Sequence, residues 1–159
     1  MSFAHLDGEG RARMVDVTAK EPAVRRAVAR GRVRCSTEVV AALREGTVPK
    51  GDVLAVARIA GIQAAKRTAD LLPLAHVIGV HGAAVDVRVT DAGVEIEART
   101  AAADRTGVEM EALTAVAVAA LAVVDMVKGM DRAATIEQVR IVRKDGGRSG
   151  TWLRPGEDT

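Results

Sequence analysis

The chain has 159 residues, of which 48% are apolar and 28% charged, and these proportions are those of one folded domain with a proper core. Its net charge of +2 comes from Lys and Arg residues that are interspersed with acids. A nucleic-acid-binding domain would carry a concentrated basic surface and, for single strands, stacking aromatics, whereas only 1% of this chain is aromatic. Composition therefore argues against nucleic acid as a partner.

The scarcity of aromatic residues and cysteine limits the structure further. Phe3 and Trp152 are the aromatics, so the core must use small aliphatic side chains, which bury little area each and favour oligomerisation.

Cys35 stands alone, which excludes an internal disulfide, and no signal-peptide pattern precedes it, so we expect a cytoplasmic protein. The longest uncharged apolar run, residues 115–124, is far shorter than the roughly 20 residues that span a bilayer, so we expect no membrane contact.

The chain is predicted to begin without regular structure and then to form a strand. Residues 1–22 show no periodic pattern, and we expect them to be a flexible N-terminal segment. Residues 23–35 mix Val and Arg in a way typical of an exposed strand, with Gly31 as a weak point.

Two helices are predicted next. Ser36 or Thr37 can cap a short helix that Gly46 closes. Asp52 is a good N-cap for a longer helix with apolar residues at helical spacing. That helix must end before Pro73, which lacks the backbone donor that a helix needs.

A change of period from Gly79 onward predicts a β-hairpin. The alternating apolar residues are Val85, Val87 and Val89 before a turn at residues 90–93, and Val94, Ile96 and Ala98 after it. Alternation of this kind is typical of antiparallel strands with one buried face.

An apolar helix over about residues 107–128 and a strand over residues 136–143 complete the predicted elements. Because the helix is apolar on almost all sides, we expect the sheet to cover one side and a second subunit another. The order of elements predicts an α+β fold, ferredoxin-like, with a mainly antiparallel sheet and helices packed on one face. We expect one catalytic domain over residues 23–150, followed by a C-terminal tail over residues 151–159.

Charged residues stand at both ends of the long apolar helix. Glu109 and Glu111 lie in its first turn, where the helix dipole favours carboxylates regardless of function. Asp125 opposes the dipole at the other end, where Lys128 shares its helix face; the two form either an acid and base pair or a salt bridge at a subunit contact. At the helical rise, Glu111 and Asp125 are about 21 Å apart. If both ends are functional, a neighbouring copy of the chain must complete the site.

Other candidates have weaker signals. Lys50 precedes a helix start, where anions are favoured, although a solvated loop lysine explains it as well. His76 can exchange protons near neutral pH, but a lone histidine is more often structural. The spacing of His76, His81 and Cys35 matches no zinc pattern, so we expect no metal. The glycine-rich residues 144–150 suit phosphate binding but lack the Walker spacing.

Seven motifs follow one another along nearly the whole chain. They are Met14-Val15-Asp16-Val17, Lys50-Gly51-Asp52-Val53, Ala57-Arg58-Ile59-Ala60-Gly61-Ile62, Ala64-Ala65-Lys66-Arg67-Thr68, the block TGVEMEALTA at residues 106–115, Asp125-Met126-Val127-Lys128 and Gly146-Gly147-Arg148-Ser149-Gly150. In this order they resemble the cyclic pyranopterin monophosphate synthases of molybdenum cofactor biosynthesis. The resemblance implies a lyase without a cofactor that converts 3′,8-cyclo-7,8-dihydroguanosine 5′-triphosphate to cyclic pyranopterin monophosphate with release of pyrophosphate. It also implies a ferredoxin-like subunit in a homohexamer of three dimers, with active sites at dimer interfaces.

The resemblance assigns roles to individual residues by their position. It implies that Asp125, Lys128 and Lys50 are catalytic. The residues that it places in the substrate pocket are Leu74, Ala75, His76, Glu109, Met110, Glu111 and Lys144.

The chain also departs from the family pattern. The family usually has Leu-Cys-His-Pro where this chain has Leu74-Ala75-His76-Val77, and Lys in place of Arg148. Losing the proline frees the backbone of the binding segment. These departures leave open an alternative, a divergent paralogue that serves as a non-catalytic nucleotide-binding or scaffolding subunit.

Overall fold

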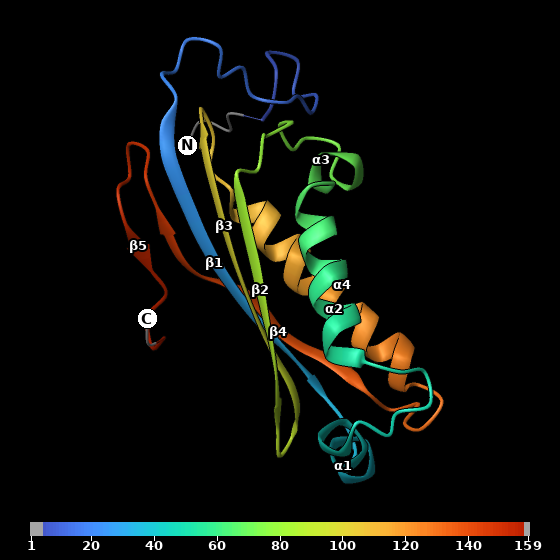
Figure 1. Cartoon of the computed structure of the whole chain (residues 1–159). Coiled ribbons are helices and arrows are strands. Elements are labelled where there is room, and N and C mark those ends of the chain that lie inside the picture. Colours follow the sequence, from blue (N-terminus) through green and yellow to red (C-terminus); the bar gives the residue numbers. More distant parts are fainter. Residues whose placement is uncertain (1–4, 158–159) are drawn as a thin grey trace.

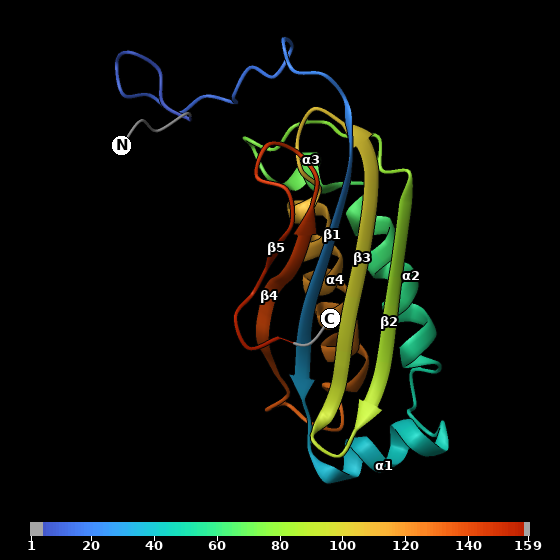
Figure 2. The same cartoon turned by 90° about the vertical axis from the view of Figure 1, so that its left-hand side faces the viewer.

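The computed structural model describes residues 5–157, which form an antiparallel sheet of five strands with helices on one face (Figures 1 and 2). In chain order the elements are β1 (Ala23–Arg34), α1 (Thr37–Glu45), α2 (Val53–Ala65), α3 (Thr68–Leu71), β2 (Gly82–Thr90), β3 (Gly93–Asp104), α4 (Glu109–Val127), β4 (Thr135–Asp145) and β5 (Trp152–Leu153). The strand order is β2-β3-β1-β4-β5. This arrangement confirms the predicted α+β, ferredoxin-like class.

The predicted helix boundaries follow from local capping. Ser36 Oγ accepts a hydrogen bond from the backbone N of Val39 at 3.3 Å, and Gly46 ends α1 in the left-handed conformation with a φ of 69°. Asp52 Oδ1 accepts from the backbone N of Ala55 at 3.0 Å and so begins α2. These caps are confirmed as predicted.

Strand β1 lies in the middle of the sheet, between β3 and β4, so the prediction of an exposed strand is wrong. Ala27 and Ala29 are buried beneath the helices, whereas the arginines that alternate with them lie on the uncovered face. Gly31 is not a weak point either. A Cβ at this position would lie 2.7 Å from Val116 Cγ1, so glycine lets α4 pack closely on β1.

Helix α4 is the core helix of the molecule. Its side from Ala112 to Val127 packs on the sheet, and α2 lies along its flank (Figure 1). Among residues 5–157 it is the one helix that is long and apolar enough to cross a membrane, and half of its most apolar window is buried inside the molecule. Packing against the sheet and α2 accounts for this apolar character.

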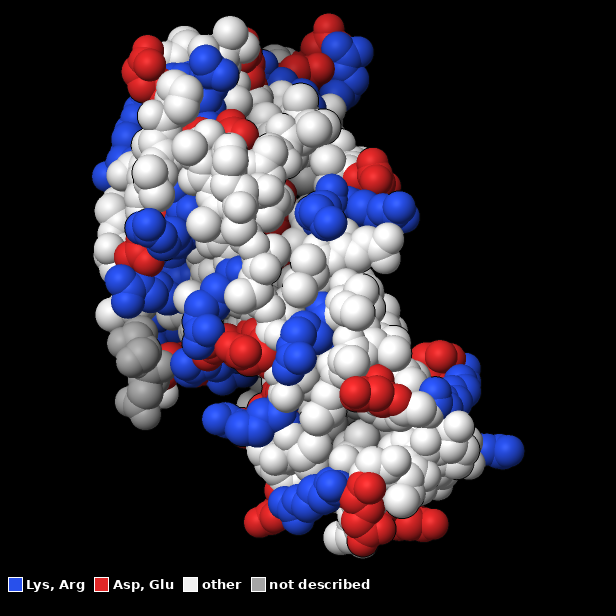
Figure 3. Space-filling model, in the orientation of Figure 1, with Lys and Arg blue, Asp and Glu red and all other residues white. Residues whose placement is uncertain are grey.

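Part of the helix layer remains uncovered. Ile59 of α2 and Leu121 of α4 are 67% and 57% exposed. Val56 is also exposed, and in Figure 3 uncharged atoms separate the blue and red groups on the helix side of the molecule. Exposed apolar side chains on two neighbouring helices offer a surface that a protein partner can cover.

Candidate active site

Three predicted charged residues meet where the turn before α2 reaches the C-terminal end of α4. Lys128 Nζ lies 2.6 Å from Asp125 Oδ1, and Lys50 Nζ lies 3.3 Å from Asp125 Oδ2. Lys50 Nζ also donates to the backbone carbonyl of Asp125 at 2.8 Å. We call Lys50, Asp125 and Lys128 the lysine–aspartate cluster.

The local sequence explains how the cluster is held. Asp125 and Lys128 share one helix face, and a turn brings Lys50 to them. In that turn Val48 is buried, and Gly51 donates to its carbonyl at 3.0 Å with a φ of 103°. The position of Lys50 therefore depends on an anchored turn and a residue free to adopt positive φ.

The two lysines set the charge of the carboxylate between them. Hydrogen bonds from Lys128 and then from Lys50 hold the pKa of Asp125 below its ordinary value, so the group is ionised at neutral pH. All three side chains remain about half exposed. The cluster can therefore exchange protons and attract phosphate, but its own chain does not enclose a substrate there.

A pocket of about 390 Å³ lies at the opposite end of α4, and its size suits a small molecule. Its walls come from the N-terminal segment, the loop after α3 and the turn that enters α4. The predicted binding residues that line it are Leu74, Ala75, His76, Glu109, Met110 and Glu111. Lys144 approaches from β4, where its Nζ lies 3.6 Å from Glu109 Oε1.

Glu111 is the buried polar group of this pocket. Glu111 is only 3% exposed to solvent. Its Oε2 has no hydrogen-bond partner among the described residues. Burial raises the pKa of Glu111, and the charges of Glu109 and Asp104 raise it further. A carboxyl group in this state offers a free acceptor to N–H groups of a ligand.

We expect Glu111→Gln to raise the free energy of unfolding of the ligand-free protein by about 1–2 kcal/mol near neutral pH, because burial disfavours the charged form of the natural carboxyl group and glutamine has no charged form. Since the folded state holds the Glu111 proton more tightly than the unfolded state, folding of the natural protein gains stability as pH falls through the raised pKa. The difference between the two proteins should therefore vanish below the ordinary value of 4.5. Urea unfolding at both pH values measures this.

Glu109→Gln is the matched control for that experiment. Glu109 is in the same helical turn but is partly exposed and paired with Lys144, so its neutralisation should bring no gain. A less stable Glu111→Gln protein at neutral pH would contradict the prediction.

The pocket and the lysine–aspartate cluster lie at opposite ends of α4 and do not meet within one chain. In Figure 1 the turn before α2 lies near α1 at the lower end, and the loop after α3 lies at the upper end. The structure confirms that the charged ends of α4 lie apart, as the helical rise predicted; a site shared between two copies stays a prediction. A single substrate reaches both groups only if they come from different copies.

His81 and Cys35, which the sequence offered as possible metal ligands, lie in surroundings that explain them without a metal. His81 Nδ1 accepts a hydrogen bond from the backbone N of Ala103 at 3.3 Å, beside strand β3. Burial raises the pKa of the Cys35 thiol to about 11, so it is protonated at neutral pH. Among residues 5–157, no group of three or more His, Cys, Asp and Glu side chains is arranged to hold a metal ion.

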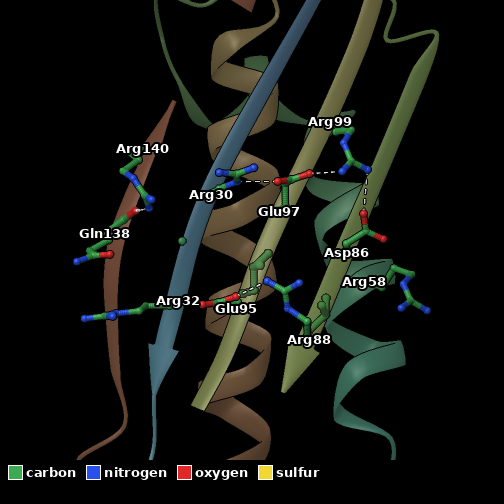
Figure 4. A pocket seen from close by; sticks show the side chains of 13 residues that line it. Arg30, Arg32, Arg58, Asp86, Arg88, Glu95, Glu97, Arg99, Gln138 and Arg140 are labelled. Carbon is green, nitrogen blue, oxygen red and sulfur yellow. Dashed lines mark hydrogen bonds and ion pairs between the residues drawn. The ribbon is translucent and has the colours of Figure 1, made fainter. Parts of the chain in front are cut away.

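A larger hollow of about 650 Å³ lies on the uncovered face of the sheet (Figure 4). Its arginines other than Arg58 are engaged with carboxylates: for example, Arg30 Nε lies 2.6 Å from Glu97 Oε2, and Arg88 binds Glu95 at 2.5 Å. Arg58 reaches round from α2 and donates to the carbonyl of Val85 at 3.2 Å. An anion would have to displace these pairs, and no predicted catalytic or substrate-binding residue lines the hollow, so we do not assign the substrate to it.

A sequence model of the MoaC family matches residues 14–147. The chain belongs to the MoaC family. The cyclic pyranopterin monophosphate synthase of Thermomicrobium roseum is 57% identical over 158 residues, which are 98% of this chain and 95% of that protein. The protein of the same name from Streptomyces coelicolor is 57% identical over 96% of this chain and 89% of its own length. Cyclic pyranopterin monophosphate synthase 2 of Mycobacterium bovis is 53% identical over 96% of this chain and 91% of its own.

The MoaC family match begins at Met14 and so includes part of the segment expected to be flexible. Val15, Val17 and Lys20 of this segment line the pocket, and sequence reasoning did not assign them there. A sequence signal for these pocket residues was present, because Met14-Val15-Asp16-Val17 is the first of the seven family motifs.

Proposed function

We propose that this chain is a cyclic pyranopterin monophosphate synthase of molybdenum cofactor biosynthesis. The reaction converts 3′,8-cyclo-7,8-dihydroguanosine 5′-triphosphate to cyclic pyranopterin monophosphate and pyrophosphate. The observation that carries the proposal is identity of 53–57% over nearly the whole chain with proteins of this name. The presence of the lysine–aspartate cluster supports catalysis over the alternative of a non-catalytic paralogue.

The cluster supplies the proton transfers of the ring rearrangement. Ionised Asp125 holds the ammonium groups of Lys50 and Lys128 in fixed positions, and each lysine can give up and regain a proton. An ammonium group also stabilises the negative charge that develops on departing pyrophosphate.

The pocket at the other end of α4 binds the substrate. Leu74, Ala75, His76 and Met110 surround it, and the free oxygen of Glu111 accepts N–H donors of the guanine-derived ring. The ion pair of Glu109 and Lys144 lies at its side and places a cation within reach of phosphate.

Two copies of the chain complete each active site. In an antiparallel pair of α4 helices about a two-fold axis, the lysine–aspartate cluster of each copy lies beside the pocket of the other. The exposed apolar residues between these ends, Val56, Ile59 and Leu121, give such a pair a surface to bury. The assembled enzyme is a cytoplasmic homohexamer of three dimers, as the resemblance implies, and binds no nucleic acid.

Incubation of the purified protein with the cyclised nucleotide tests the function. We expect equal amounts of pyrophosphate and pterin product, measured by a coupled phosphate assay and by fluorescence after oxidation. Tight substrate binding without product would instead favour the non-catalytic paralogue. In that case the turnover of Ala75→Cys with Val77→Pro, which returns the segment to the family pattern, shows whether these two departures cause the loss of activity.

A further inference from the structure

The N-terminal segment runs across the pocket as an extended strap, which we define as residues 14–20. In Figure 2 it leaves the start of β1 and passes above the loop that follows α3. Val15, Val17 and Lys20 of the strap line the pocket opposite the turn that enters α4. The pocket therefore owes one wall to a segment that has no helix or strand.

Two side chains from the body of the molecule hold the strap near its ends. The ring Nε2 of His76 donates to the backbone carbonyl of Val15 at 2.5 Å. Arg105 Nε donates to the backbone carbonyl of Lys20 at 2.7 Å. Both bonds end on backbone oxygens, so they fix the path of the strap without depending on its side chains.

The strap is also shaped from within. Asp16 Oδ1 accepts from the backbone N of Thr18 at 2.9 Å, and Lys20 N donates to the carbonyl of Val17 at 3.0 Å. This turn between the two tethers presents Lys20 to the pocket. The turn and the tethers together give an otherwise irregular segment one conformation.

Lys20 differs from the other charged groups of the pocket. Glu109 is paired with Lys144, and Glu111 is buried, whereas no carboxylate of the described residues lies within ion-pair distance of Lys20 Nζ. An ammonium group without a protein partner, at the wall of a pocket for a phosphorylated ligand, binds phosphate without first breaking an ion pair.

We propose that the strap is the outer wall of the substrate pocket, that His76 and Arg105 are its positioning residues, and that Lys20 binds a phosphate group of the substrate. The inference rests on the proposed function for the identity of the substrate. It gives His76 a task that differs from substrate contact: its ring N–H holds the wall in place.

Lys20→Ala tests the phosphate contact. We expect KM to rise about 10-fold or more with kcat changed less than about 2-fold, because one charge-assisted contact made equally in the ground state and the transition state is lost. Lys20→Arg should restore most of the loss. Arg13→Ala, which removes an exposed cation of the same segment outside the pocket, is the matched control. An equal KM for Lys20→Ala and Arg13→Ala would overturn the role of Lys20.

Hydrogen exchange of the strap tests the positioning residues independently of turnover. In His76→Ala we expect strap amides to exchange at least about 10-fold faster and affinity for pyrophosphate, used as the probe, to fall. His76→Gln keeps an N–H donor and should restore both, and Arg105→Gln should loosen the Lys20 end. Unchanged exchange in His76→Ala would overturn the tether. Absence of product with the natural protein would reject the proposed function instead, and the exchange and pyrophosphate measurements would still decide the strap.

Discussion

Replacing Asp125 by asparagine is expected to lower kcat by about 10³-fold, within the range that a positioned proton-transfer system contributes. Asparagine has the same shape but no charge, so the two ammonium groups lose the carboxylate that separates and orients them. Asp125 is more than half exposed, so the fold and the assembly should persist. Pyrophosphate release measures kcat, and sedimentation velocity measures the assembly.

Asp52→Asn is the matched control for this substitution. It makes the same chemical change at the N-cap of α2, two residues after Lys50, and asparagine also caps helices well. We therefore expect nearly normal turnover from it. Dissociation of the Asp125→Asn oligomer would show that the cluster is a structural salt bridge, as the sequence also allowed.

Mixing two inactive variants should restore activity if each active site takes its two half-sites from different copies. Asp125→Asn removes the function of the cluster, and Glu111→Ala removes the buried acceptor of the pocket. After dissociation and random reassembly, half of the pairs contain one chain of each kind. Each mixed pair has one site with both substitutions and one with neither, so about a quarter of the natural activity should return.

Mixing without dissociation, and reassembly of each variant with itself, are the controls for this experiment. Neither should regain activity, because neither forms a site without a substitution. An inactive reassembled mixture whose chains have exchanged, as seen by mass spectrometry, would place both half-sites in one chain and reject the shared site. Activity well above a quarter would mean that one of the variants retains function by itself.

Much of the fold could be predicted because its signals are local. The caps at Ser36 and Asp52, the positive φ of Gly46 and the alternation around residues 90–93 each involve neighbours in the sequence. These features define helix and hairpin boundaries before any long-range contact forms. The class of fold then follows from the order of the elements.

The site could be predicted in part. Asp125 and Lys128 share a helix face, so their pairing follows from helical geometry. Lys50 was assigned beside them through the family resemblance, and no spacing rule links residues so far apart in the chain. The buried state of Glu111 was also beyond reach, because burial of its carboxyl depends on the strands and loops around α4.

By itself, then, the sequence determined helices α1, α2 and α4, the hairpin, the charged ends of α4 and the family to which the chain belongs. Only the tertiary structure decided that β1 is a central strand, that Glu111 is buried without a partner for one oxygen, and that the strap forms a wall of the pocket. The physical reason is the range of the interactions. Caps and periodicity act between residues a few positions apart, whereas burial and the tether from His76 to Val15 exist only once distant segments have packed together.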